Sequence, residues 1–398
     1  MQSKNIILLF FLTLVTFGFS QKIELSPLSE ISVLTCGPGD DLYTSFGHSA
    51  FRVQDRTLGI DAVYNYGTFD FNPPWFYLEF TQGKLIYSLG RQRMERFLAE
   101  YKYYDRWVKE NKLNLSLEER NKLFQFLEHN YLPENRDYRY DFFYDNCATK
   151  IWDVLKENFN NKLTFSPNYI EEQYTFRELI HQNLEFNSWA AFGIDLALGS
   201  VIDKKATPQE HMYLPAYIMK QLTHATLNGK PLSEKTKVVF EPVRGNKNSI
   251  FFTSPLFWLN LILILGIALT YNDFRKKRRT KWFDFLLFFI TGLAGLLLFH
   301  LWFLTEHTTT VGNFNLFWVF PLNLAVAFFM ISKKPLPVWI SKYLLLLLVL
   351  LGATILVWLL NIQVFSPMII PLLILLAVRY LFLFQLSNRI KTSNNIPI

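Results

Sequence analysis

The chain has 398 residues and a formal net charge of +7, and 51% of its residues are hydrophobic. Charged residues make up 18%, against about 25% in an average globular domain, and most of them lie between Lys22 and Lys247. From Phe251 onward the sequence consists largely of Leu, Ile, Phe, Val and Trp. Two such compositions exclude a single soluble domain, and they indicate one part in water and another in a membrane.

Residues 1–20 have the pattern of a secretory signal peptide. Lys4 provides a positive start, residues 6–17 are apolar, and residues 18–20 include small residues suited to cleavage. The apolar run is shorter than the roughly 20 residues of a membrane span, which favours cleavage over the alternative of an uncleaved anchor helix. In either case we expect residues 21–250 to lie outside the cytoplasm.

The exported part shows strand patterns first and helical patterns afterwards. A glycine turn at Gly47 and His48 precedes the first strand, and the second strand is rich in β-branched and aromatic residues. One helix begins at Ser116 with Glu119 three residues on, which is the signature of a capping box. The predicted elements are strands at 49–54 and 62–69 and helices at 94–104 and 117–130. We therefore expect an α+β domain.

The two cysteines of the chain lie in different contexts. Cys147 follows Asp145 and Asn146, either of which can cap a helix, so the cysteine lies in a first helical turn. Unpaired N–H groups and the helix dipole stabilise a thiolate there, and the same N–H groups can hold an oxyanion. Cys36 ends an apolar strand, as a small buried hydrophobe does. A disulfide between them is the alternative, which these contexts disfavour.

A thiolate nucleophile needs a base, and the base needs an orienting partner. His48 is the best candidate of the seven histidines because it opens a strand after a glycine, although a lone histidine can also be an ordinary core residue. Asn65 on the next strand can accept the Nδ1 proton of His48, as Asn does in papain-like sites. Asp61 and Tyr66 are alternatives for this third position. We expect neither a metal nor a cofactor.

Five apolar runs after residue 250 are long enough to span a membrane. They lie at 251–271, 283–304, 314–331, 343–361 and 368–386. The loops at 272–282 and 333–342 and the tail at 387–398 carry Lys or Arg, whereas 305–313 and 362–367 carry neither. The positive-inside rule therefore predicts an all-α transmembrane domain over 251–386 with a cytoplasmic tail. The basic excess follows from these loops and does not indicate a nucleic-acid partner.

Polar residues follow the second predicted span on its outer side. Glu306, His307 and Asn313 face the compartment of the exported domain. They either cap helices at the membrane surface or contribute to a substrate site there, and we take them as candidate substrate-binding residues. The aromatic run at 69–77 could form a further wall of that site or belong to an ordinary core.

The order of His on a strand, a polar residue on the next strand and Asn-Cys at a helix start resembles the circularly permuted NlpC-type papain-like enzymes, which include lecithin:retinol acyltransferase. Four segments are more closely similar to the Lnb family of lipoprotein N-acyltransferases. They are YTSFGHSAFRV at 43–53, YNYGTFDF at 64–71, YDNCAT at 144–149 and the sequence at 306–324. That family joins an exported domain to five transmembrane helices. The resemblance covers nearly the whole chain, with no departure at His48 or Cys147.

The resemblance implies a multi-pass inner-membrane enzyme whose permuted papain-like domain faces the periplasm. Cys147 would accept an acyl chain from a phospholipid as a thioester and pass it to the N-terminal amine of a diacylated lipoprotein. Both substrates lie at the outer face of the membrane, within reach of a tethered domain. The alternatives are a membrane-tethered cysteine peptidase or amidase and a non-catalytic sensor or assembly factor.

Overall fold

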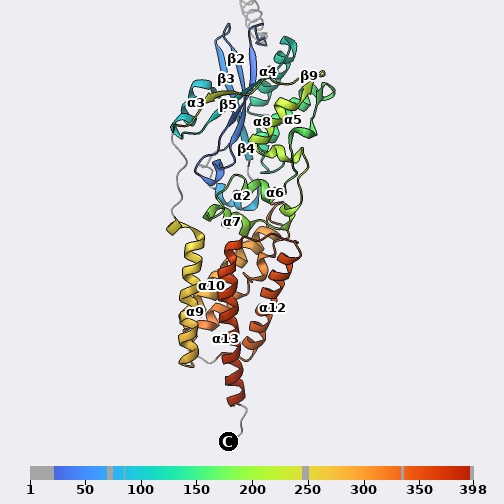
Figure 1. Ribbon diagram of the computed structural model, residues 1–398. Helices are drawn as coiled ribbons and strands as arrows, with labels where there is room; N and C mark the ends of the chain where they lie inside the picture. The colour runs from blue at the N-terminus through green and yellow to red at the C-terminus, as the bar shows by residue number, and fades with distance from the viewer. Residues whose placement is uncertain (1–21, 70–74, 85, 244–250, 333–335, 395–398) are drawn as a thin grey trace, which may run out of the picture.

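The computed structural model of the protein describes residues 22–69, 75–84, 86–243, 251–332 and 336–394. It consists of a sheet-containing domain at one end and a helical bundle at the other (Figure 1). This order confirms the predicted α+β exported domain followed by an all-α transmembrane part. The predicted signal peptide and residues 70–74 of the aromatic run lie outside the described residues.

The exported domain is built on a seven-stranded antiparallel sheet with the order β10-β5-β1-β2-β3-β4-β6. Its strands are β1 (Glu30–Cys36), β2 (His48–Asp55), β3 (Ile60–Thr68), β4 (Ile86–Arg93), β5 (Val108–Lys112), β6 (Asp137–Arg139) and β10 (Lys237–Phe240). Successive side chains of a strand point to opposite faces. Val33 therefore enters the larger core, and its neighbour Leu34 enters a smaller core on the other face.

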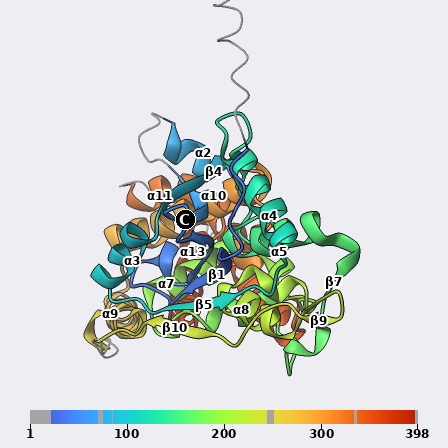
Figure 2. The ribbon, with the colours of Figure 1, turned by 90° about the horizontal axis from the view of Figure 1, so that it is seen from above.

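Helices cover both faces of this sheet (Figure 2). The smaller core lies under α3 (Met94–Tyr103), and the larger one under α4 (Leu117–Tyr131), α5 (Cys147–Phe159) and α8 (Pro215–His224). The two predicted strands appear as β2 and β3, and the two predicted helices as α3 and α4. The capping box is confirmed, because Ser116 Oγ accepts from the Glu119 N–H at 3.2 Å and the Glu119 carboxylate accepts from the Ser116 N–H at 2.9 Å.

Several short elements complete the exported domain, and the sequence showed no pattern for those after α5. They are α2 (Phe76–Gln82), α6 (Phe176–His181), α7 (Trp189–Ala197) and a three-stranded sheet of β7 (Leu163–Thr164), β8 (Thr226–Leu227) and β9 (Lys230–Pro231). Helices α2, α6 and α7 lie at the end of the domain that faces the bundle (Figure 1). Phe192 and Leu196 of α7 pack against the core of the bundle, so this helix joins the two parts.

The bundle contains four described helices that are long and apolar enough to cross a membrane. They are α9 (Pro255–Arg275), α10 (Lys281–Phe303), α12 (Trp339–Leu359) and α13 (Ile370–Asn394), the last preceded by a 3-10 turn at Pro367–Ile369. The third predicted span at 314–331 differs from the prediction. It consists of a 3-10 turn at Phe314–Phe317 and a short helix, α11 (Asn323–Ile331), of 9 residues. At 1.5 Å per residue this helix covers about 14 Å, less than half of the roughly 30 Å of a bilayer core.

Close packing explains how the broken third segment is tolerated. A Cβ on Gly292 or Gly295 of α10 would overlap the backbone of Leu324 or Val319, so the segment lies directly against α10. Non-helical backbone at membrane depth persists only where protein or a water-filled cavity covers it. The Asn323 side chain at the start of α11 is also satisfied within the protein, because its amide bonds to neighbouring helices.

Candidate active site

Cys147 is the first residue of α5, and Asn146 rather than Asp145 caps this helix. Asn146 Oδ1 accepts from two N–H groups of the first turn, at 2.8 and 3.0 Å, and Thr149 Oγ1 accepts from the Asn146 N–H at 2.8 Å. The Asn146 amide also donates to the carbonyl oxygens of Phe142 and Tyr213. These bonds hold the cysteine at one place against the sheet.

His48 is the first residue of β2, and the preceding glycine determines where it begins. Gly47 has φ +81°, and a Cβ there would lie 2.7 Å from the Cys36 carbonyl oxygen, so the turn requires glycine. His48 Nε2 lies 2.5 Å from Asn65 Oδ1 on β3. The structure thus joins the two predicted residues through Nε2 rather than through the expected Nδ1. Nδ1 is therefore the ring nitrogen left for the interaction with Cys147 that raises the pKa of His48.

Cys147 and His48 shift each other's pKa in opposite directions. Burial by itself raises the pKa of the Cys147 thiol, but the His48 charge and hydrogen bonds from His48 and from the Ser49 and Cys147 N–H groups outweigh it, and the pKa is lowered. Burial by itself lowers the pKa of His48, but the thiolate and the bond to Asn65 outweigh it, and the pKa is raised. The site therefore favours a thiolate–imidazolium pair.

For the reaction proposed below, in which Cys147 is the nucleophile and becomes acylated, we predict a bell-shaped pH dependence. The rate falls as the pH drops through the lowered thiol pKa, because the nucleophile is then protonated. It falls again as the pH rises through the raised pKa of His48, because the imidazolium that protonates the leaving group is lost. Asn65→Ala should move the basic limb to lower pH, since it removes a bond that raises the His48 pKa. A single inflection near the ordinary thiol pKa of about 8.5 would contradict the ion pair.

Three tyrosines lie close enough to Cys147 for its charge to raise their pKa, and the sequence pattern did not predict them. Tyr87 of β4 stacks on Tyr140 with ring centroids 4.1 Å apart, and it pairs across the strands with Tyr138 of β6. Burial raises the pKa of Tyr87 to about 12, and the charge on Cys147 adds to this effect. The three rings are therefore uncharged at neutral pH. Their only signal in the sequence is the pair of tyrosines at 138 and 140 shortly before the Asn-Cys motif.

The Tyr138 hydroxyl differs from the rest of the site because the described residues leave its hydrogen-bonding capacity unused. It is buried and has no hydrogen-bond partner among the described residues. A Cβ on Gly67, where φ is +92°, would lie 3.6 Å from Cys147 Cβ, 3.8 Å from His48 Cε1 and 3.9 Å from Tyr138 Oη. These side chains therefore enclose a small space that the glycine leaves open. Burial raises the pKa of Tyr138 strongly, so its hydroxyl keeps its proton and can donate a hydrogen bond.

Glu306 lies where the bundle meets the exported domain. Its carboxylate pairs with Arg139 and lies 3.6 Å from Lys84 Nζ, and its N–H donates to the Gln82 carbonyl at 3.0 Å. His307 lies beside Gly83, because a Cβ on that glycine would be 3.1 Å from His307 Nδ1. These two predicted substrate-binding residues thus lie at the edge of the exported domain near Tyr138, the tyrosine beside the thiol.

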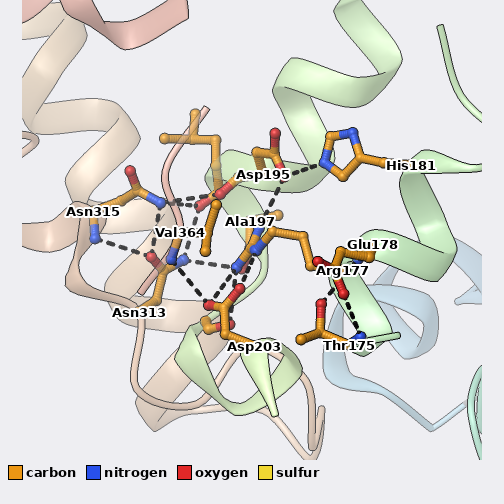
Figure 3. Close-up of polar contacts among 12 residues, drawn as sticks. Thr175, Arg177, Glu178, His181, Asp195, Ala197, Asp203, Asn313, Asn315 and Val364 are labelled. Carbon is orange, nitrogen blue, oxygen red and sulfur yellow. Dashed lines mark hydrogen bonds and ion pairs between the residues drawn. The ribbon is translucent and has the colours of Figure 1, made fainter. Parts of the chain in front are cut away.

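Asn313 has a different position from the one expected of a substrate-binding residue. It is buried, and its amide donates to the carbonyl oxygens of Leu196 and Ala197 at the end of α7, at 2.8 and 3.0 Å. Its Oδ1 accepts from Asn315, which also bonds to α7 (Figure 3). The side chain is fully used in joining the bundle to α7. The contacts of Asn313 therefore fit the capping alternative, here at the junction of the two domains, and a role in substrate binding stays a prediction.

A buried ion-pair cluster supports the same junction from the exported side (Figure 3). Arg177 of α6 pairs with Asp203 at 2.6 Å and with Asp195 of α7 at 2.9 Å. His181 also bonds to Asp195, and Asp203 accepts from the Val364 N–H of the bundle at 3.3 Å. Breaking one member of a buried pair leaves an uncompensated charge. The cluster therefore fixes α7, and with it the bundle, relative to the exported domain.

Comparisons with known families match both halves of the chain. The description Lnb N-terminal periplasmic domain matches residues 19–182, and Lnb transmembrane domain matches residues 246–391. No curated protein and no solved structure gives a significant match. Among the described residues no group of His, Cys, Asp or Glu could hold a metal ion. The two matches cover His48, Asn65, Cys147 and Glu306 and leave residues 1–18, 183–245 and 392–398 unmatched. The chain belongs to the Lnb family.

Proposed function

We propose that the protein is a lipoprotein N-acyltransferase that uses Cys147 as its nucleophile. The observation that carries the proposal is the position of the Cys147–His48–Asn65 set. It lies in the exported domain, which α7 and Glu306 hold against the outer end of a membrane bundle. A phospholipid ester and the N-terminal amine of a diacylated lipoprotein both lie at that surface, on the periplasmic side of the inner membrane.

The first half-reaction forms a thioester. The Cys147 thiolate attacks the carbonyl carbon of a phospholipid acyl ester, and the negative charge moves to the carbonyl oxygen. The N–H of Cys147 at the helix start and the O–H of Tyr138 are the donors placed to stabilise that oxyanion. The bond from carbon to the glycerol oxygen then breaks. His48 gives its proton to this oxygen, so a lysophospholipid leaves and the neutral imidazole remains.

The second half-reaction transfers the acyl chain to nitrogen. The neutral α-amine of the lipoprotein attacks the thioester, and the same donors hold the new oxyanion. The C–S bond breaks, the thiolate leaves, and His48 accepts the proton that the amine loses as the amide forms. This step restores the thiolate–imidazolium pair. Because water competes with the amine, the packed rings of Tyr87 and Tyr140 beside the thiol favour transfer over hydrolysis.

Tyr138→Phe should lower the rate of thioester formation by about 10²–10³-fold, the usual effect of removing one oxyanion donor. The fold should be unaffected, because the hydroxyl has no partner among the described residues and the ring is retained. The measurement is the rate of acyl-enzyme formation, with alkylation of Cys147 as the control. A variant that acylates at the wild-type rate would show that the hydroxyl does not contact the oxyanion.

The function itself is tested in cells and with purified protein. Incubation with phospholipid should add one acyl mass to the peptide that contains Cys147. Cells that lack the gene should make lipoproteins without their amide-linked acyl chain, and the wild-type gene but not Cys147→Ala should restore it. Retention of that chain, in cells with no other such transferase, would refute the proposal. Release of free fatty acid or cleavage of peptides without transfer would favour the hydrolase alternative.

A further inference from the structure

A charged pocket lies at the junction between the exported domain and the outer end of α10. Its cavity volume is about 390 Å³, and it is lined by Lys84, Ile86, Asp137, Tyr138, Arg139 and Glu306. The lining comes from the segment after α2, from the paired strands β4 and β6, and from the residues after α10. Tyr138 takes part in both this pocket and the space beside Cys147. Tyr138 is thus the residue that the pocket shares with the surroundings of Cys147.

The charged side chains that line the pocket are two cations, Lys84 and Arg139, and two carboxylates, Asp137 and Glu306. Lys84 and Arg139 both pair with the single carboxylate of Glu306. Asp137 is occupied elsewhere, because it accepts from Ser88 Oγ at 2.5 Å and lies 4.0 Å from its neighbour Arg136. The side chains of Lys84 and Arg139 are at least half exposed, so their remaining N–H donors are available to a ligand. An anion with two or more free oxygens would accept hydrogen bonds from both side chains.

The position of the pocket favours a lipid as the source of that anion. The Glu306 N–H bonds to Gln82, and Gly83, with φ +72°, lies against His307, so Lys84 is held at the outer end of a membrane helix. Phospholipid phosphates lie at this level of a membrane. Ile86 adds an apolar wall, and its side chain is largely exposed.

We propose that Lys84 and Arg139 bind the phosphodiester of the phospholipid acyl donor, which competes for both cations with the carboxylate of Glu306. The glycerol backbone then lies along Tyr138, and the acyl ester reaches Cys147 past that ring. This proposal rests on the acyltransferase function and extends it by naming the part of the donor that is recognised. A phosphodiester has two free oxygens, which can accept hydrogen bonds from both cations.

The test uses the full chain with Cys147→Ala, in non-ionic detergent, and measures binding of radiolabelled dihexanoyl-phosphatidylethanolamine. The double variant Lys84→Gln and Arg139→Gln should weaken this binding by about tenfold or more, because it removes two charge-assisted contacts. Binding of dihexanoylglycerol, which has no phosphate, should stay the same. The matched control is Arg96→Gln with Lys102→Gln, two exposed cations of α3 outside the pocket, which should leave both ligands unaffected.

A change of opposite sign is expected for Glu306→Gln, because it frees both cations and should tighten phospholipid binding. Weaker binding in this variant, equal to that of the double variant, would show that the cations are not the contact and would overturn the proposal. So would unchanged phospholipid binding in the double variant. Inorganic phosphate at millimolar concentration should compete poorly, and full competition by phosphate would assign the pocket to a free anion and overturn the lipid assignment.

The same variants in the Cys147 background separate this proposal from the function on which it rests. Thioester formation should need about tenfold more phospholipid in the double variant than in the wild type. Wild-type concentration dependence in the double variant would overturn the pocket assignment while the acyltransferase function stands. Selective phospholipid binding without any thioester in the wild type would support the phosphate contact. It would also refute the proposed acyltransferase function.

Discussion

Cys147→Ser should abolish thioester formation and acyl transfer, whereas Cys36→Ser should retain measurable activity. The loss for Cys147 is expected to approach about 10⁶-fold, as when a catalytic nucleophile with a histidine base is removed. A serine hydroxyl lacks the lowered pKa that keeps Cys147 ionised beside His48. Burial instead raises the pKa of the Cys36 thiol, which ends β1 and is almost fully covered, so this thiol stays protonated and unreactive.

Cys36→Ser is a suitable control for Cys147→Ser, because both cysteines are free thiols in the structure and each variant replaces one thiol by a hydroxyl. Cys36→Ser places a hydroxyl in an apolar core and should cost about 1–3 kcal/mol of stability, which thermal unfolding would detect separately from the rate. Iodoacetamide should label Cys147 first in the native wild-type protein. Two thiols that resist labelling until a reductant is added would instead indicate a disulfide and contradict the assignment of the nucleophile.

Those parts of the site that depend on local sequence could be predicted. The cap residue before Cys147, the glycine before His48 and the next strand with Asn65 each follow from neighbours within a few positions. The ring nitrogen that faces Asn65 could not be predicted, because it depends on the rotamer of His48 and on how β2 and α5 meet. Sequence spacing contains no information on that geometry.

The residues that the sequence analysis missed are placed by long-range pairing. Tyr138 comes beside the thiol because β6 pairs with β4 at the edge of the sheet, and a three-residue strand has no periodicity to detect. The pairing of Glu306 with Arg139 likewise depends on how two domains dock. Tyrosines in an aromatic-rich sequence resemble ordinary core residues until the fold shows that one hydroxyl has no partner among the described residues.

Hydropathy alone also overestimated the regularity of the membrane part. The run at 314–331 is apolar enough to be counted as a span, but it contains Pro321 and packs against Gly292 and Gly295. Close contact with α10 lets this segment leave the helical path without exposing its backbone to lipid. Similarly, Arg379 is buried in α13 with Asp273 and Asp284 as partners, a set from three helices that no single segment reveals.

His48→Ala should lower the rate of acyl transfer by about 10²–10⁴-fold, the usual contribution of a general acid–base group. The proposed reaction gives this histidine two tasks, because it pairs with the thiolate, whose pKa it lowers, and protonates the glycerol oxygen that leaves. Asn65→Ala should cost less, since it removes only the bond that orients the ring through Nε2. His224→Ala, on the exposed end of α8, is the matched control and should have wild-type turnover.

The pH dependence of the variants separates the two tasks of His48. Without the imidazolium, the pKa of Cys147 should return toward its ordinary value or above it, because burial then acts unopposed. Alkylation of Cys147 in His48→Ala should therefore recover at alkaline pH, whereas acyl transfer should not recover unless free imidazole supplies the missing acid. In Asn65→Ala, alkylation of Cys147 should still occur at the lower pH seen in the wild type, since the ring can still contact the thiol. Wild-type turnover in His48→Ala would mean that another group serves as the base, and the papain-like assignment of this site would be wrong.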